Sequence, residues 1–154
     1  MNTPEDFMSY CLDLGKLALK NGDPPVGAIL VYDDEIIGKG IESGKTTGDN
    51  TNHAEILAVR DAIANGNKGK LSQSTMYSTH EPCIMCSYLI RTYKIPNIVY
   101  SSDVDDVGGY SSRFSLLKTE CILKWGKAPK VIRGTLKEES FLLSKQYEMR
   151  LKSK

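Results

Sequence analysis

Two short segments of the chain combine the residue types that a catalytic metal site needs. The first is His53-Ala54-Glu55, and the second, further along, is Cys83-Ile84-Met85-Cys86. Zinc in a catalytic site takes three nitrogen, sulfur or oxygen ligands and keeps its fourth position for water. One imidazole and two thiolates therefore predict one Zn²⁺ per chain with a water or hydroxide in the open position. Glu55 is the carboxylate that could move the protons of that water.

The cysteine spacing favours a metal pair at the beginning of a helix. Positions i and i+3 lie on one helix face, and Pro82 suits the first turn. A helix N-terminus lowers the pKa of nearby thiols, so we expect both sulfurs to be thiolates. By itself, a Cys-x-x-Cys pair also fits a thioredoxin-type redox pair or half of a zinc ribbon.

The spacing of His53 and Glu55 sets a geometric condition. Two residues along a regular helix are separated by about 200° of rotation, so they cannot face one site. We therefore expect His53 to stand at the helix entry, off the regular path, with Glu55 directed into the pocket. Otherwise His53 would be a cap or core histidine and Glu55 a solvated charge. His80 is a competing ligand, but its place at a predicted strand end favours a pocket-wall role.

Hydrophobic periodicity predicts the elements that position these residues. Helices are expected at 3–21, 53–64, 82–93 and 136–152, and strands at 26–32, 35–41, 75–79, 97–101 and 130–135. Segments 42–52 and 103–113 are expected to be loops, with an optional further helix before the last strand. This order predicts one sheet covered by helices on both faces, in a single domain that spans residues 1–154.

Several local features can be checked against the structure. Thr3-Pro4 is typical of a helix start and Asn21-Gly22 of a helix stop. Asp33-Asp34 is expected to form a hairpin turn. We also expect five apolar side chains on the first two long helices to be buried: Cys11, Leu57, Ala58, Ala62 and Ile63.

Composition narrows the class of protein further. The chain has 154 residues, 40% of them hydrophobic and 25% charged, with a formal net charge of +1. These values fit a folded core and disfavour a disordered protein or a domain that binds nucleic acid mainly through phosphates. The polar N-terminus and the lack of about 18 consecutive apolar residues predict no signal peptide, no membrane span and a cytoplasmic location.

The pattern H-x-E followed by P-C-x-x-C is the signature of zinc deaminases. The chain resembles the cytidine-deaminase-like superfamily, in the branch of tRNA adenosine deaminases, guanine deaminases and fungal-type cytosine deaminases. Segments 25–31 and 36–40 resemble the first two strands of that family. The resemblance implies a three-layer α/β/α sandwich with a mixed five-stranded sheet, assembled as a dimer or tetramer, and we expect a homodimer for this chain. It also implies a hydrolase with His53, Cys83 and Cys86 on zinc and Glu55 as the catalytic proton carrier.

The resemblance places further residues near the substrate. It implies contacts from the backbone at Ala54 and Cys83, and Val26, His80 and Asp103 are further candidates. Members of the branch usually carry an asparagine where this chain has Glu42. An ionised carboxylate only accepts hydrogen bonds, so Glu42 would favour a ring edge that presents N–H groups. A shift of one residue would place Ser43 there instead, and Glu42 could also be an exposed loop acid.

A second departure concerns the loop after the fourth strand. Bacterial tRNA deaminases carry a basic and then an acidic residue there, whereas this chain has Asp103-Val104-Asp105-Asp106. Three acids would repel phosphates, which favours a small substrate. The amphipathic C-terminal segment resembles the tRNA-type final helix in layout, but we favour an ordinary solvated helix end, where the helix dipole favours cations.

These observations lead to one main hypothesis. It is hydrolytic deamination of a free nucleobase or nucleoside, with a purine such as guanine preferred and ammonia released. The alternatives are conversion of adenosine to inosine in tRNA, a non-catalytic zinc-stabilised partner subunit, and a nucleic-acid-binding domain without chemistry.

Overall fold

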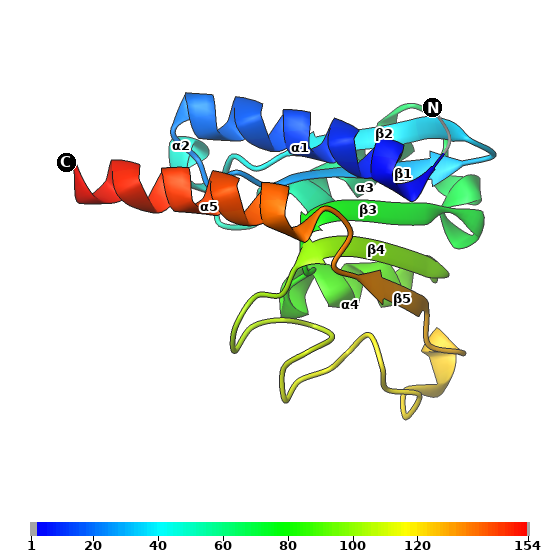
Figure 1. The fold of residues 1–154 in the computed structure, drawn as a ribbon. Helices are drawn as coiled ribbons and strands as arrows, with labels where there is room; N and C mark the ends of the chain where they lie inside the picture. The colour runs from blue at the N-terminus through cyan, green and yellow to red at the C-terminus, as the bar shows by residue number, and fades with distance from the viewer. Residues whose placement is uncertain (1–2, 154) are drawn as a thin grey trace.

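A computed structural model describes residues 3–153, with a mixed five-stranded sheet between two layers of helices (Figure 1). Helices α1 and α5 cover one face, and α3 and α4 cover the other, which confirms the predicted three-layer α/β/α sandwich. The elements are α1 (Pro4–Asn21), β1 (Gly27–Tyr32), β2 (Glu35–Ile41), α2 (Gly44–Thr47), α3 (Ala54–Ala64), η1 (Lys68–Gln73), β3 (Thr75–His80), α4 (Ile84–Thr92), β4 (Asn97–Ser102), η2 (Leu123–Trp125), β5 (Lys130–Arg133) and α5 (Lys137–Lys152).

The strand order, β2-β1-β3-β4-β5, brings the predicted site residues to one edge of the sheet. β1 runs antiparallel to β2 and β3, whereas β3, β4 and β5 are parallel. Because Gly27 pairs with Ile41 and Ala28 pairs with Ser78, the beginning of β1 lies beside the ends of β2 and β3. Helices α3 and α4, which carry the candidate ligands, follow β2 and β3 and begin near this edge.

The central strands are apolar on both faces because helices cover both faces. In β1, Ala28 and Leu30 pack with α3 and α4, while Ile29 and Val31 pack against α1. The same alternation continues through the neighbouring strands, with Met76 and Ile98 on the first side and Tyr77 and Val99 on the second.

The local turn and cap predictions are confirmed. Thr3 and Asp6 form a capping box at the beginning of α1, and Gly22 ends the helix at φ 99°. Asp33 and Asp34 both have positive φ in the β1–β2 turn. Cys11 is fully buried in the core, as expected.

Four details differ from the sequence-based expectations. The predicted loop 42–52 contains the one-turn helix α2, and the 3₁₀ helix η1 forms where no element was predicted. The optional helix before the last strand is present as the short 3₁₀ helix η2. Pro82 lies before the N-cap of α4 rather than in its first turn. The last helix is less amphipathic than expected, because Ser140 and Leu143 are its buried residues.

Leu57 and Ile63 are half-buried rather than buried, because α3 meets the sheet along a different stripe. Alanines face the sheet at positions 54, 58 and 62, and all three are fully buried. Small residues on β2 allow this close approach: a Cβ on Gly40 would overlap the carbonyl oxygen of Ala54. The contact sets the distance between α3 and the sheet.

We therefore expect Gly40→Ala to destabilise the protein by about 2 kcal/mol or more, since overpacking a filled contact forces backbone shifts. The free energy of unfolding in urea measures the effect. Gly69→Ala is the matched control, because a Cβ at Gly69 meets no atom within 4 Å. Equal stability of the two variants would contradict the proposed packing constraint.

Within residues 3–153, no helix has both the length and the apolar character needed to cross a membrane.

Candidate active site

Three potential metal ligands converge at the N-termini of α3 and α4. His53 is the N-cap of α3, Cys83 is the N-cap of α4, and Cys86 lies in the first turn of α4. His53 Nδ1 lies 3.4 Å from Cys83 Sγ and 3.5 Å from Cys86 Sγ. Within residues 3–153, these three form the one group of three or more potential ligands whose donor atoms converge, all within 4.8 Å.

The donor set fits zinc in both chemistry and spacing. A tetrahedral zinc ion with bonds of about 2.3 Å to sulfur and about 2.0 Å to nitrogen holds these atoms about 3.5 Å apart. The measured nitrogen–sulfur distances of 3.4 and 3.5 Å are close to this value. Three protein ligands leave one position open, as a catalytic rather than a structural zinc site requires.

Glu55 lies beside these ligands because His53 departs from helical geometry. The backbone of His53 is extended, with φ −73° and ψ 148°, so the helix begins only at Ala54. His53 therefore stands at the helix entry, off the regular helical path, as its spacing from Glu55 required. Glu55 is 4% exposed. Burial raises the pKa of its carboxyl to about 8, and the negative charge of Cys83 acts in the same direction.

In the metal-free site, the pKa values of the two cysteine thiols are shifted in opposite directions. Hydrogen bonds from Cys86 and His53 lower the pKa of the Cys83 thiol to about 4, although burial opposes them. The pKa of the Cys86 thiol is raised, chiefly by its hydrogen bond with Cys83 and secondly by burial. Two adjacent thiolates repel each other, so the pair keeps one proton. A coordinated cation would reverse this for Cys86, because metal binding displaces thiol protons.

Glu42 is buried near this group, so the interpretation of an exposed loop acid is wrong. Its side chain is 8% exposed, and its Oε2 accepts a hydrogen bond from the Gly44 amide at 3.2 Å. Burial raises the pKa of its carboxyl, while the charge of His53 and the amides of Gly44 and Ala54 oppose that rise. The Glu42 amide donates to the Val26 carbonyl at 3.0 Å, which brings both candidate substrate contacts together.

Ser43, the alternative to Glu42 in the sequence analysis, lies at the beginning of α2. It is half-buried, and its carbonyl accepts the Thr47 hydroxyl at 2.5 Å. Its amide donates to the Asn52 carbonyl at 3.1 Å. These bonds close the segment that leads into His53.

His80 lies outside the ligand group. Its Nδ1 is 3.0 Å from the Thr79 hydroxyl, and its Nε2 is 3.0 Å from the Ser144 hydroxyl on α5. Burial lowers the pKa of the imidazole to about 4, so the ring is neutral at pH 7. This placement argues against the role of a competing ligand, and the expected role in a pocket wall stays a prediction.

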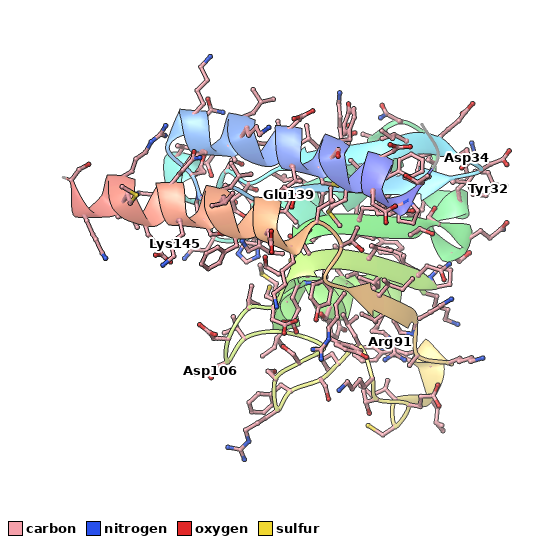
Figure 2. All side chains as sticks on the ribbon, in the orientation of Figure 1. Tyr32, Asp34, Arg91, Asp106, Glu139 and Lys145 are labelled. Carbon is pink, nitrogen blue, oxygen red and sulfur yellow. The ribbon has the colours of Figure 1, made fainter. Side chains whose placement is uncertain are left out.

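Asp103 lies at the rim of a cavity of about 800 Å³ beside the loop that follows β4. Its carboxylate accepts a hydrogen bond from the Tyr100 hydroxyl at 2.6 Å and pairs with Arg133 at 3.5 Å. Asp105 and Asp106 line the same cavity. Asp106 is seen on this loop, on the same side of the molecule as Lys145 of α5 (Figure 2).

Glu81 organises this loop, a role that the sequence analysis missed. It is 2% exposed, and its carboxylate accepts hydrogen bonds from the backbone amides of Val104, Tyr110 and Ser111 at 2.7–2.9 Å. The Ser111 hydroxyl adds a fourth bond at 2.7 Å. The only signal was its position directly before Pro82-Cys83, because its partners lie far away in the sequence. Glu81 thereby fixes the loop next to the ligand-bearing turn.

Glu81→Gln is expected to destabilise the protein by about 2–3 kcal/mol, since an amide cannot satisfy every donor that faces the carboxylate. Amide hydrogen exchange should rise across residues 104–111, and urea unfolding should give the energetic cost. Glu120→Gln is the control, because Glu120 is an exposed acid that accepts a single bond, from the Ala128 amide. Unchanged exchange in the Glu81 variant would contradict the organising role.

Comparison with known proteins decides the family. A family model described as the cytidine and deoxycytidylate deaminase zinc-binding region matches residues 1–102. The chain belongs to this deaminase family. The matched segment contains His53, Glu55, Cys83 and Cys86, so the family's zinc-binding region coincides with the converging donor atoms.

Relatives within the deaminase family differ in the substrate that their names describe. The tRNA-specific adenosine deaminase of Aquifex aeolicus is 36% identical over 147 residues, which cover 94% of this chain and 93% of that protein. A structure from a study of A-to-I editing by tRNA:A34 deaminases has a TM-score of 0.81 at 28% identity, covering 90% of this chain and 98% of that chain. The structure of the guanine deaminase of Bacillus subtilis has a TM-score of 0.62 at 31% identity, and the match covers 67% of this chain and 66% of that chain. The chain is thus a zinc-type deaminase whose relatives include both substrate classes.

Proposed function

We propose that this deaminase acts on a free nucleobase or nucleoside, with guanine or a similar aminated purine as its substrate. The reaction replaces the ring amino group with oxygen from water and releases ammonia. The observation that carries the proposal is Glu42, a buried carboxylate beside Ala54 and His53. A carboxylate accepts hydrogen bonds only, so it matches a ring edge with adjacent N–H donors.

Glu55 is the proton carrier in this proposal. When bound, zinc holds water and lowers the pKa of that water towards about 7. Glu55 takes one proton from the attacking water and delivers it to a ring nitrogen. It then takes the water's second proton from the hydroxyl group that has formed on the ring carbon and passes it to the amino group, which leaves as ammonia. Burial supports both tasks, because desolvation raises the pKa of the Glu55 carboxyl above its usual value, towards the range in which one group can both take up and release protons.

The charge beside the site also supports a small substrate. Asp103, Asp105 and Asp106 line the cavity next to the ligand-bearing turn, and they would repel the phosphates of a polynucleotide. Arg113 and Arg133 line the same cavity and offset only part of this charge.

A second candidate function is adenosine-to-inosine conversion in tRNA. The observation that favours it is the 36% identity to the Aquifex aeolicus enzyme along nearly the full length of both chains. Two lysines also lie over aromatic rings on α5, Lys45 over Tyr147 and Lys145 over Phe141. Cations and aromatic rings of this kind can contact a nucleic-acid backbone and its bases.

Ammonia release from the zinc-loaded protein separates the two candidates. The panel contains guanine, adenine, cytosine, their nucleosides and bulk tRNA. Release from a small base with tRNA unmodified would support the first candidate, and inosine found only in tRNA would support the second. Zinc-loaded protein that is inactive on the whole panel would contradict both.

Glu42→Gln tests the residue that carries the proposal. For guanine, we expect kcat/KM to fall about 10–100-fold, the effect of losing a hydrogen bond to a charged group. Zinc content should stay at the wild-type level, since Glu42 is not a ligand in the proposed site. Glu35→Gln, an exposed acid on β2, serves as the control. An unchanged preference for guanine in the Glu42 variant would contradict the assignment.

A further inference from the structure

Helix α5 is fastened to the sheet edge that carries the site through polar rather than apolar side chains. Ser140 is fully buried, and its hydroxyl donates to the Thr79 carbonyl at 2.9 Å. The Ser102 hydroxyl donates to Ser140 at 3.0 Å. These contacts join α5 to the last residues of β3 and β4, where Figure 1 shows α5 running past the edge of the sheet. Ser144, one turn later, lies on the same face of the helix.

His80 extends this attachment towards the candidate substrate contacts. Its Nε2 contacts Ser144 at 3.0 Å and its Nδ1 contacts the Thr79 hydroxyl at 3.0 Å. The same Thr79 hydroxyl accepts a hydrogen bond from the Gly27 amide at 3.2 Å. A chain of hydrogen bonds therefore connects α5, the end of β3 and the beginning of β1. The residue directly before β1 is Val26, whose carbonyl oxygen accepts a hydrogen bond from the Glu42 amide.

A neutral imidazole suits this position better than other side chains. It presents one donor and one acceptor in fixed directions, and a hydroxyl can act as either on both sides. Both nitrogens of His80 are thus satisfied in either tautomer. An apolar residue of similar size would leave the Ser144 hydroxyl without this partner.

We propose that His80 is a positioning residue for deamination, which holds α5 against the strand ends and so sets one wall of the substrate pocket. The proposal rests on the proposed function and assigns to His80 no contact with the reacting atoms. His80 acts through Ser144 on α5, and through Thr79 on the segment that leads to Glu42. Loss of the His80–Ser144 contact should therefore weaken substrate binding more than it slows the chemical step.

Three substitutions separate the two contacts of His80. His80→Asn keeps a polar atom near the Nδ1 position and loses the contact with Ser144. His80→Gln places an amide near the Nε2 position and keeps that contact. His80→Leu removes both. Ser144→Ala removes the same contact from the other side, so combining it with His80→Asn should add nothing further.

Amide hydrogen exchange of residues 137–152 is the first measurement, and it needs no substrate. We expect exchange in α5 to rise about tenfold in the Asn, Leu and Ser144→Ala variants, and to stay near the wild-type rate in His80→Gln. Unchanged exchange in the Asn and Leu variants, or a Gln variant that behaves like Leu, would overturn the proposal.

Steady-state kinetics on the preferred substrate is the second measurement. KM should rise about tenfold in His80→Asn and Ser144→Ala, while kcat stays within about threefold of wild type. A fall in kcat with an unchanged KM would assign His80 to the chemistry and overturn the positioning role. If α5 exchanges faster in the variants but the wild-type protein deaminates nothing on the panel, the proposed function is contradicted and the attachment of α5 by His80 is not. Normal exchange and KM in His80→Leu would contradict the positioning role alone.

Discussion

Glu55→Gln keeps its zinc and its fold but loses roughly 10²–10⁴-fold in kcat, the range expected when a general acid–base group is removed. Glutamine matches glutamate in size and can still form hydrogen bonds, but it cannot accept and release the proton that hydrolysis requires. The side chain is 4% exposed, so bulk water cannot easily replace it as the proton carrier. Ammonia release measures the loss, and metal analysis with urea unfolding verifies the fold.

Glu139→Gln is the matched control for Glu55→Gln. Glu139 is an exposed acid in the first turn of α5, labelled in Figure 2, so its replacement should leave kcat unchanged. Activity close to wild type in the Glu55 variant would remove Glu55 from the mechanism.

Cys83→Ala loses zinc and the stability that zinc contributes, which is the second large effect. Cys83 supplies one of three converging donors, and its Sγ also accepts the Cys86 amide at 3.4 Å at the beginning of α4. With two donors left, zinc occupancy after dialysis should fall below about one tenth of the wild-type value, since each ligand contributes strongly to affinity. The unfolding temperature of the variant should not change when a chelator is added, whereas that of the wild type should fall.

Cys121→Ala controls for the loss of a thiol as such. Cys121 is exposed and lies outside the group of converging ligands. This variant should retain full zinc occupancy and the wild-type response to a chelator. Full zinc occupancy in Cys83→Ala would show that Cys83 is not a ligand.

The ligand-bearing elements were predictable from sequence because their signals are local. The H-x-E and P-C-x-x-C segments together resemble the zinc deaminase signature, which points to the donors. The polar run before His53 indicates where its helix begins. The continuous apolar run in β1 likewise predicts a strand that is covered on both faces. These features depend on neighbours within a few residues, so no knowledge of tertiary contacts was needed.

The missed features depend on residues that are distant in the sequence. Glu81 binds amides of Val104, Tyr110 and Ser111, and His80 meets Ser144, so neither pairing produces a local pattern. The burial of α3 was misjudged for a related reason, because the glycines of β2 decide which face of that helix approaches the sheet. Assembly as a homodimer stays a prediction.

The order of these elements along the chain has a consequence for biosynthesis. All three candidate zinc ligands lie between His53 and Cys86, whereas α5 begins only at Lys137. During translation, the donors therefore leave the ribosome well before the helix that His80 and Ser140 fasten to the sheet edge. If His80 positions α5 as proposed, the emerging chain contains all of its candidate zinc ligands before it contains the helix that would set the wall of the substrate pocket.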